Sequence, residues 1–280
     1  MNNTDITQIA TQVRRDILRM VHGCNSGHPG GSLGAADLLT LLYFEIMDIK
    51  LPFEMNGKEE DIFFLSNGHI SPLFYSILAR RGYFDYKELA TFRRLNSRLQ
   101  GHPTNHDNLP GVRISSGSLG QGLSVAAGAA LAKRMDGDPK NVYVLCGDGE
   151  LQEGQIWEAA LFAAHYKLSN LIAFVDWNGQ QIDGSNEDVI SLGDLSAKWK
   201  SFGWDVQTVE KGNDIVEIRK AILIAKENIF TAHPKIILLK TKMGKGVDFM
   251  EGTHHWHGIA PNDEQLKSAL LQLPSALLDY

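Results

Sequence analysis

The chain has few cysteines and no long apolar run. Cys24 and Cys146 are the only cysteines in 280 residues, too few for a disulfide framework, so we expect a reducing, cytoplasmic location. No apolar stretch approaches the roughly 18 residues that a membrane span needs. The first residues also lack the basic stretch and apolar core of a secretory signal peptide. We therefore expect a cytoplasmic protein with no membrane partner.

Basic residues are also fewer than acidic residues. The chain has 27 Lys and Arg residues against 33 Asp and Glu, and the net charge of −6 argues against a nucleic-acid partner held by bulk electrostatics. A composition of 43% hydrophobic and 21% charged residues is ordinary for a globular protein. Because no repeat, low-complexity segment or interdomain linker is evident, we expect residues 1–280 to form a single domain.

Hydrophobic periodicity alternates between helix-like and strand-like segments along nearly the whole chain. It predicts helices at residues 5–22, 33–46, 70–80, 86–92, 119–135, 155–166, 195–202, 215–228 and 263–273. It predicts strands at residues 61–65, 142–146, 171–176, 204–209 and 235–241. This order is typical of an α/β fold, a three-layer arrangement in which a single parallel sheet has helices on both faces. Long polar loops follow the strands, where open α/β sheets bind ligands.

Two polar turns, each after an expected strand, point to an ion site. Asp148 lies in a Gly-Asp-Gly turn, and Asn178 follows 30 positions later. Asp148 alone could simply cap the next helix, because Asp is a preferred N-cap residue. With Asn178, and with the Gln180 carbonyl in reach if its turn is tight, it makes a set of hard oxygens suited to Mg²⁺. The following helix start offers free N–H groups to a phosphate, so we predict a metal-bridged diphosphate.

Three histidines share an unusual setting. His28, His69 and His102 each lie in a loop with glycine beside them. Any one of them could be an ordinary surface histidine, but three such loops on one sheet favour a function. An imidazole suits proton transfer because its pKa lies near neutrality.

Six motifs resemble those of the transketolase family, in the same order and with the same spacing. They are N-S-G-H-P-G-G (residues 25–31), L-S-N-G-H (65–69), G-H-P (101–103), S-G-S-L-G-Q-G (116–122), G-D-G-E-L-Q-E-G (147–154) and G-T-H-H-W-H-G (252–258). Ser118 departs from the family, where proline is usual. The resemblance covers only the N-terminal, diphosphate-binding part of a full-length transketolase. It implies the thiamine-diphosphate-binding fold of the PP domain, with the pyrimidine and C-terminal domains on a partner chain.

Thiamine diphosphate and Mg²⁺ are the cofactors that the resemblance implies, and Ca²⁺ or Mn²⁺ could replace the magnesium. The implied metal ligands are Asp148, Asn178 and Gln180. The implied cofactor-binding residues are His69, Gly117, Ser118, Leu119, Gly147, Asp148, Gly149, Glu150, Glu153, Asn178, Ile182 and His254. Leu119 and Ile182 could equally be core residues. Glu153 resembles an acidic residue at the family's dimer interface, but it could also be a carboxylate favoured at a helix start by the macrodipole.

Histidines at the family's motif positions are implied to line the channel to the thiazolium, to bind sugar hydroxyls and to move protons. The implied catalytic residues are His28, His69, His102 and one histidine of the last motif, His254 or His257. Because Trp256 is an insertion in that motif, the alignment leaves both histidines open. We favour His254.

The resemblance implies an enzyme of carbohydrate metabolism, as in the pentose phosphate pathway, that transfers a two-carbon ketol unit from a ketose to an aldose. In the family, the glutamate that activates the cofactor comes from a pyrimidine domain on another chain. A partner subunit is therefore implied, in an α₂β₂ heterotetramer. Apolar residues at 119–135 and 156–162 are a candidate contact with this partner, although they could also pack within the chain.

Several alternatives stay open for the substrate and the activity. Xylulose 5-phosphate is the default donor, but split transketolases also act on unusual sugars such as apulose phosphate or sulfosugars. A 1-deoxyxylulose-5-phosphate synthase or a 2-oxo-acid dehydrogenase subunit is a related alternative, and the His28 and His102 motifs argue against the second. The alternative of another class is a non-catalytic binding or regulatory relic of the fold. Intact Asp148 and Asn178, together with the loop histidines, argue against such a relic.

Overall fold

A five-stranded parallel sheet forms the centre of the computed structural model, which describes residues 3–227, 232–275 and 277–280. Its strands are β1 (Ile62–Leu65), β2 (Val142–Gly147), β3 (Leu171–Asp176), β6 (Asp205–Val209) and β7 (Lys235–Leu239). They lie in the order β1-β2-β3-β7-β6, and every neighbouring pair is parallel. Because parallel strands all end at one edge, the loops that follow them meet there.

Alternate residues of each central strand face two separate hydrophobic cores. Phe63, Leu65, Tyr143 and Leu145 belong to one core, and the intervening residues of the same strands belong to the other. Such strands are buried on both faces, which explains their nearly continuous apolar sequences. The predicted three-layer α/β fold with a parallel sheet is confirmed.

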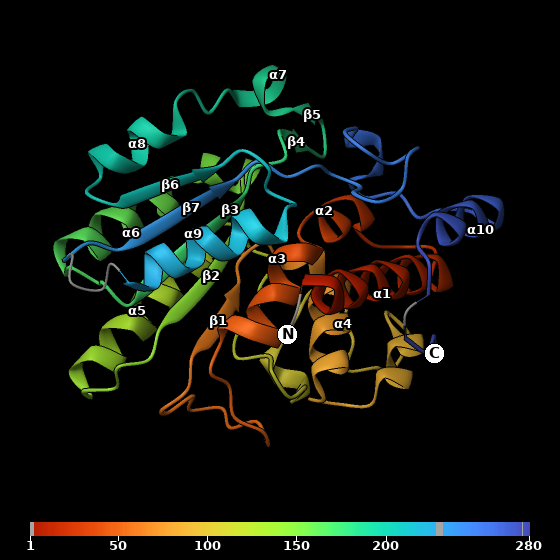
Figure 1. The fold of residues 1–280 in the computed structure, drawn as a ribbon, viewed down its shortest axis with the longest axis horizontal. Coiled ribbons are helices and arrows are strands. Elements are labelled where there is room, and N and C mark those ends of the chain that lie inside the picture. Colours follow the sequence, from red (N-terminus) through yellow and green to blue (C-terminus); the bar gives the residue numbers. More distant parts are fainter. Residues whose placement is uncertain (1–2, 228–231, 276) are drawn as a thin grey trace.

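Helices cover both faces of the sheet (Figure 1). The first core lies beneath α1 (Asn3–Gly23), α2 (Pro29–Gly34), α3 (Ala36–Leu41), α4 (Ser71–Arg81) and α9 (Ile215–Glu227). The second lies beneath α5 (Gln121–Met135), α6 (Gly154–His165) and α8 (Leu195–Ser201). Helix α10 (Asp263–Gln272) packs near α1 at the end of the chain. Within the described residues, none of the helices is both long and apolar enough to cross a membrane.

The structure differs from the predicted elements in several places. The helix predicted at 33–46 is split into α2 and α3 and ends in a π-helical turn, η1 (Leu42–Ile46). Helix α2 begins earlier than predicted because Pro29 suits a first helical turn, where its missing N–H needs no partner. The segment predicted as a helix at 86–92 is a 3₁₀ helix, η3 (Tyr86–Thr91). Residue 228, the predicted end of the helix from 215, lies outside the described residues.

A small unit after β3 was not predicted. It consists of an antiparallel hairpin, β4 (Gln180–Gln181) and β5 (Gly184–Ser185), followed by α7 (Asn186–Ile190). These strands are too short to show periodicity in the sequence. The hairpin follows Asn178 directly and stands at the sheet edge where the strands end (Figure 1).

Candidate active site

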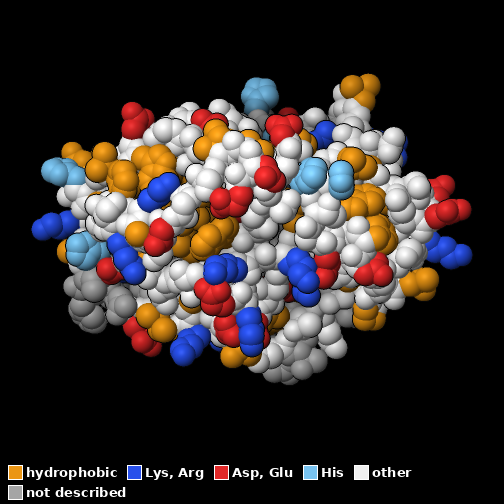
Figure 2. Space-filling view, turned by 90° about the horizontal axis from the view of Figure 1, so that it is seen from above, with side chains coloured by type: hydrophobic (Ala, Val, Ile, Leu, Met, Phe, Trp, Pro, Cys, Tyr) orange, Lys and Arg blue, Asp and Glu red, His pale blue; other side chains and the backbone are white. Residues whose placement is uncertain are grey.

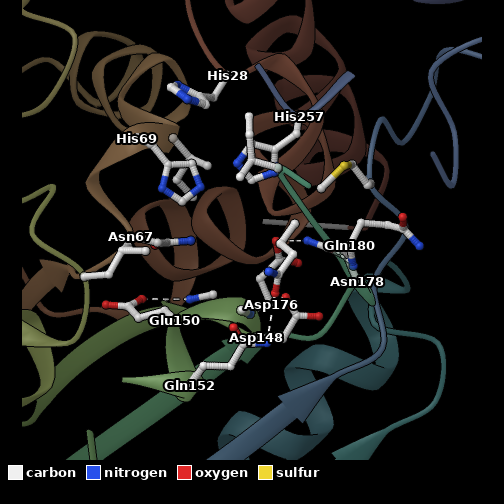
Figure 3. Close-up of a pocket in the computed structure, with 18 of the residues that line it drawn as sticks. His28, Asn67, His69, Asp148, Glu150, Gln152, Asp176, Asn178, Gln180 and His257 are labelled. Atoms are coloured by element: carbon white, nitrogen blue, oxygen red, sulfur yellow. Dashed lines mark hydrogen bonds between the residues drawn. The ribbon is translucent and has the colours of Figure 1, made fainter. Parts of the chain in front are cut away.

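A cavity of about 520 Å³ lies at the carboxyl ends of β1, β2 and β3. The loops after these strands, the start of α2 and the β4–β5 hairpin all contribute to its wall (Figure 3). Its lining includes His28, Asn67, His69, Gly117, Leu119, Gly147, Asp148, Gly149, Glu150, Glu153, Asp176, Asn178, Gln180, Ile182 and His257. Most residues that the sequence singled out therefore come together in one place.

Asp148 joins the ends of β2 and β3. Its Oδ2 accepts a hydrogen bond from the N–H of Gly179 at 2.6 Å, and its Oδ1 accepts one from the N–H of Gly149 at 2.8 Å. Its own N–H donates to the carbonyl of Asp176 at 3.3 Å. The segment after Gly149 is a short 3₁₀ helix, η5 (Gly149–Gln152), and α6 begins only at Gly154. The carboxylate is thus held in place before any ion binds.

Asp176 orients the turn that carries Asn178. Its carboxylate accepts hydrogen bonds from the Asn178 amide at 2.9 Å and from the hydroxyl of Thr241. The Asn178 Oδ1 in turn accepts from the N–H of Gln180 at 2.9 Å, so this turn is as tight as expected. The three predicted metal ligands therefore lie on two adjoining turns, and all three residues line the cavity.

Three buried carboxylates line this cavity, those of Asp148, Glu150 and Asp176, and none of them forms an ion pair with a described residue. Burial, and then the charge of Asp176, raises the pKa of Asp148 to about 7. Burial likewise raises the pKa of Asp176 to about 6. A divalent cation would offset this repulsion and hold Asp148 ionised. The described residues contain no group of three His, Cys, Asp or Glu side chains able to hold a metal, so an ion here needs amide, carbonyl and ligand oxygens.

Three histidines face the carboxylates across the cavity (Figure 3). The ring centroids of His28 and His69 are 5.1 Å apart, and His257 lies 5.5 Å from His28. Burial, helped by His257, lowers the pKa of His69 to about 3 and that of His28 to about 4. Burial also lowers the pKa of His257. These imidazoles are neutral near pH 7, so each can donate one hydrogen bond and accept another.

The structure contradicts the preference for His254 over His257, because His257 and not His254 lines the cavity. His254 is outside the cavity lining, and its ring pairs with that of His255 at 4.3 Å. Thr253 caps the 3₁₀ turn η7 (His254–Trp256) by accepting from the N–H of His255. After this turn, His257 is the histidine that lies against His28 and lines the cavity.

Two other predicted residues stand at the margin of the cavity. His102 is exposed and does not line it, although its ring centroid is 6.3 Å from that of His28. The ring packs on Gly117, where a Cβ would lie only 2.8 Å from the imidazole. Ser118 is also exposed and outside the lining. Their side chains therefore face the open side, where a ligand or a second chain could reach them.

Of three further residues predicted to bind the cofactor, one lies in the cavity wall and two lie at its rim. Glu150 is buried in the wall, where its carboxylate accepts hydrogen bonds from the Ser66 hydroxyl and from the N–H groups of Gly120 and Gly147. Burial raises the pKa of Glu150, and its donors partly oppose that effect. Glu153 and Ile182 lie at the exposed rim, and the 57% exposure of Ile182 shows that it is not a core residue.

Asn67 is a cavity residue that sequence reasoning missed. Its side chain is 2% exposed, and its Oδ1 is buried without a hydrogen-bond partner among the described residues. The Nδ1 atoms of His28 and His257 are likewise buried and unpartnered. The signal was present, because Asn67 belongs to the same L-S-N-G-H motif as His69. Unpaired buried polar atoms in a cavity fit a polar ligand that would pair with them.

The fold and the cavity define an α/β protein with a polar cavity at the carboxyl edge of its parallel sheet. The family model described as "Transketolase, thiamine diphosphate binding domain" matches residues 6–273. The chain belongs to this family. The family predicted from the motifs, and with it a transferase subunit that binds thiamine diphosphate, is confirmed.

Named relatives include two transketolase subunits of nearly the same length. The chain is 40% identical to the 6-deoxy-6-sulfo-D-fructose transketolase subunit of Clostridium sp. (strain MSTE9), covering 96% of each chain. It is 38% identical to an apulose-4-phosphate transketolase subunit of Actinobacillus succinogenes, again covering 96% of each. Among solved structures, it resembles the transketolase from Campylobacter jejuni with a TM-score of 0.90 and 34% identity. That match covers 98% of this chain but only 43% of the other.

Proposed function

We propose that this chain is the cofactor-binding subunit of a two-chain transketolase. The complex would transfer a two-carbon ketol unit from a ketose donor to an aldose acceptor. One observation carries the proposal: the ion-binding turns of Asp148 and Asn178 share a single cavity with the His28, His69 and His257 cluster. One side of the cavity would hold the cofactor diphosphate, and the facing side would carry the groups that handle sugar protons.

Each part of the cavity would have a separate task. Asp148, Asn178 and the Gln180 carbonyl would hold Mg²⁺, or Ca²⁺ or Mn²⁺ in its place, against the diphosphate. Thiamine diphosphate, when bound, supplies the thiazolium carbon at which the sugar carbon–carbon bond is cleaved and formed. The neutral imidazoles of His28, His69 and His257 would bind sugar hydroxyls and accept or return their protons. His102 would act from the mouth of the cavity, and Leu119 and Ile182 would contact the cofactor.

A partner subunit is part of the proposal. The named relatives are called subunits, and this chain spans about two fifths of the solved full-length transketolases that it matches. We propose that residues 1–280 are the diphosphate-binding domain and that a partner supplies the pyrimidine and C-terminal domains in a cytoplasmic α₂β₂ assembly. Exposed apolar residues on α5 and α6, among them Val125, Leu161 and Phe162, support a contact on this face. Figure 2 shows a different side, the one uppermost in Figure 1, where apolar side chains lie among mixed charges.

The donor sugar has two candidates. The relatives' names favour an unusual ketose, such as a sulfosugar or apulose 4-phosphate, and the general family favours xylulose 5-phosphate.

The test of the proposed function is to co-purify this chain with the product of a neighbouring reading frame that encodes the missing domains. Ketose donors would then be screened with thiamine diphosphate and Mg²⁺. Turnover by the pair, and none by either chain alone, is the expected result. Tight cofactor binding with no ketol transfer from any donor would favour the non-catalytic alternative.

A further inference from the structure

Glu150 lies in the cavity wall, between the ion-binding turn and the loop before α5. Its side chain is 2% exposed. Its Oε1 accepts hydrogen bonds from the Ser66 hydroxyl and, at 2.7 Å, from the N–H of Gly120, and its Oε2 accepts from the N–H of Gly147 at 3.0 Å. One carboxylate thus ties together the end of β1, the loop before α5 and the end of β2.

The backbones of these segments lie very close together around Glu150. Little room is left there for other side chains to link the segments. The N–H of Gly122 donates to the Ser66 Oγ at 3.1 Å, and a Cβ at position 122 would lie only 2.5 Å from the Ser66 Cβ. A Cβ at Gly68 would lie 2.6 Å from the carbonyl carbon of Ser116. Only glycine permits contacts this close.

The hydrogen bonds of Glu150 to Gly120 and Gly147 hold two walls of the cavity in place. Gly120 immediately follows Leu119, which lines the cavity, and Gly147 immediately precedes Asp148. Without an acceptor at Glu150, the N–H groups of Gly120 and Gly147 would be buried and unpaired, which is costly. Helix α6 supports the same loop, because the Gln155 amide donates to the Leu119 carbonyl at 2.7 Å.

We propose that Glu150 is a positioning residue for cofactor binding: it sets the distance between the Gly117–Leu119 wall and the turn that carries Asp148. It acts through backbone N–H groups and touches neither metal nor sugar. The proposal rests on the proposed function of the cavity as the cofactor site. It gives Glu150 a different task from the metal ligands and the histidines.

Two variants test this proposal, with a matched control. Glu150→Gln keeps the size of the side chain but turns an NH₂ group toward the N–H of Gly120 or Gly147. Ser66→Ala removes one donor to the carboxylate and also the acceptor of the Gly122 N–H, and it leaves the carboxylate in place, so only exchange at residues 116–121 reports on Glu150 in this variant. Asp136→Asn neutralises an exposed carboxylate at the end of α5 and serves as the control.

The first readout is hydrogen exchange of the isolated full chain, followed on peptides that cover residues 116–122. Faster exchange in Glu150→Gln and Ser66→Ala, with no change in Asp136→Asn, is expected. The second readout is binding of thiamine diphosphate with Mg²⁺ to the complex of both subunits. Affinity should fall roughly tenfold, as it does when supporting groups behind a metal site are removed. At saturating cofactor, kcat should change much less than this affinity.

Unchanged exchange and unchanged affinity in a folded Glu150→Gln variant would overturn the proposal. If that variant does not fold, Ser66→Ala decides through exchange at residues 116–121, because it keeps the carboxylate and two of its three donors. Absence of cofactor binding by the wild-type complex would instead count against the proposed function. The exchange rates would then still decide whether Glu150 bridges the two walls.

Discussion

The imidazoles of His69 and His257 stack in the cavity, with ring centroids 5.2 Å apart and planes inclined by 27°. One follows β1 near the start of the chain and the other follows β7 near its end. Burial lowers the pKa of both rings, and two rings this close would repel each other if both were protonated. A bound diphosphate would bring negative charge to the cavity and raise both pKa values.

The structure predicts that His257, and not His254, is needed for turnover. His257→Ala should lower kcat/KM of the two-subunit enzyme by about 100-fold or more, the usual size of a lost proton-transfer group. His254→Ala should stay close to wild type, because His254 lies outside the cavity. Steady-state kinetics on both variants checks this. Equal losses in the two variants would contradict the placement of His257.

Burial of His69 makes the stability of the cofactor-free chain depend on pH. Its pKa falls from 6.5 to about 3 on folding, so the unfolded chain binds more protons between those values and stability is lost as pH drops below 6.5. The wild type should lose more stability between pH 7.5 and 5 than His69→Asn, by about 1–2 kcal/mol. Urea unfolding at both pH values measures the difference. An equal loss in both proteins would mean that His69 is protonated in the fold.

Asp176→Asn should stabilise the metal-free chain above pH 6. The pKa of Asp176 rises from 3.8 to about 6 on folding, so its ionised form opposes folding above that pH and this penalty vanishes below 3.8. An asparagine can still accept from Asn178 and donate to Thr241, so the hydrogen bonds survive. We expect a gain of about 1–3 kcal/mol at pH 8 and little gain at pH 4 in urea unfolding. A loss at both pH values would show that the carboxylate itself holds the turn.

Metal removal should abolish cofactor binding through Asp148. EDTA should release thiamine diphosphate from the two-subunit complex, and Mg²⁺, Ca²⁺ or Mn²⁺ should restore binding. Asp148→Ala should bind no cofactor with any of these three metals, yet it should remain folded. Isothermal titration calorimetry measures binding, and circular dichroism checks the fold. Metal-independent binding by the wild type would refute the assignment of Asp148, Asn178 and Gln180 as metal ligands.

An exposed apolar residue of α6 should decide the association with the partner. Leu161 is 59% exposed on α6, and Leu161→Asp should weaken the complex at least tenfold by placing a charge in the contact. Leu223, 44% exposed on α9, offers a matched control because α9 covers the opposite face of the sheet. Analytical ultracentrifugation of each variant with the partner checks this. Equal effects of Leu161→Asp and Leu223→Asp would place the interface elsewhere.

Sequence alone determined the sheet, the family and the positions of the Asp148 and Asn178 turns. These are local properties, because the strands are continuous apolar runs, and Asp148 and Asn178 each lie at the end of their own strand. The carboxyl ends of parallel strands must meet, so two distant turns could be placed together without a structure.

Only the tertiary structure decided the direction in which individual side chains point. The 3₁₀ turn at His254–Trp256 brings His257 into the cavity, and a sequence motif does not show that rotation. Glu150 turns toward Ser66, Gly120 and Gly147, which come from other segments of the chain. Asn67 lines the cavity, and the segments around it leave its Oδ1 buried without a partner among the described residues. Side-chain direction depends on contacts between distant segments, and local sequence patterns do not encode those contacts.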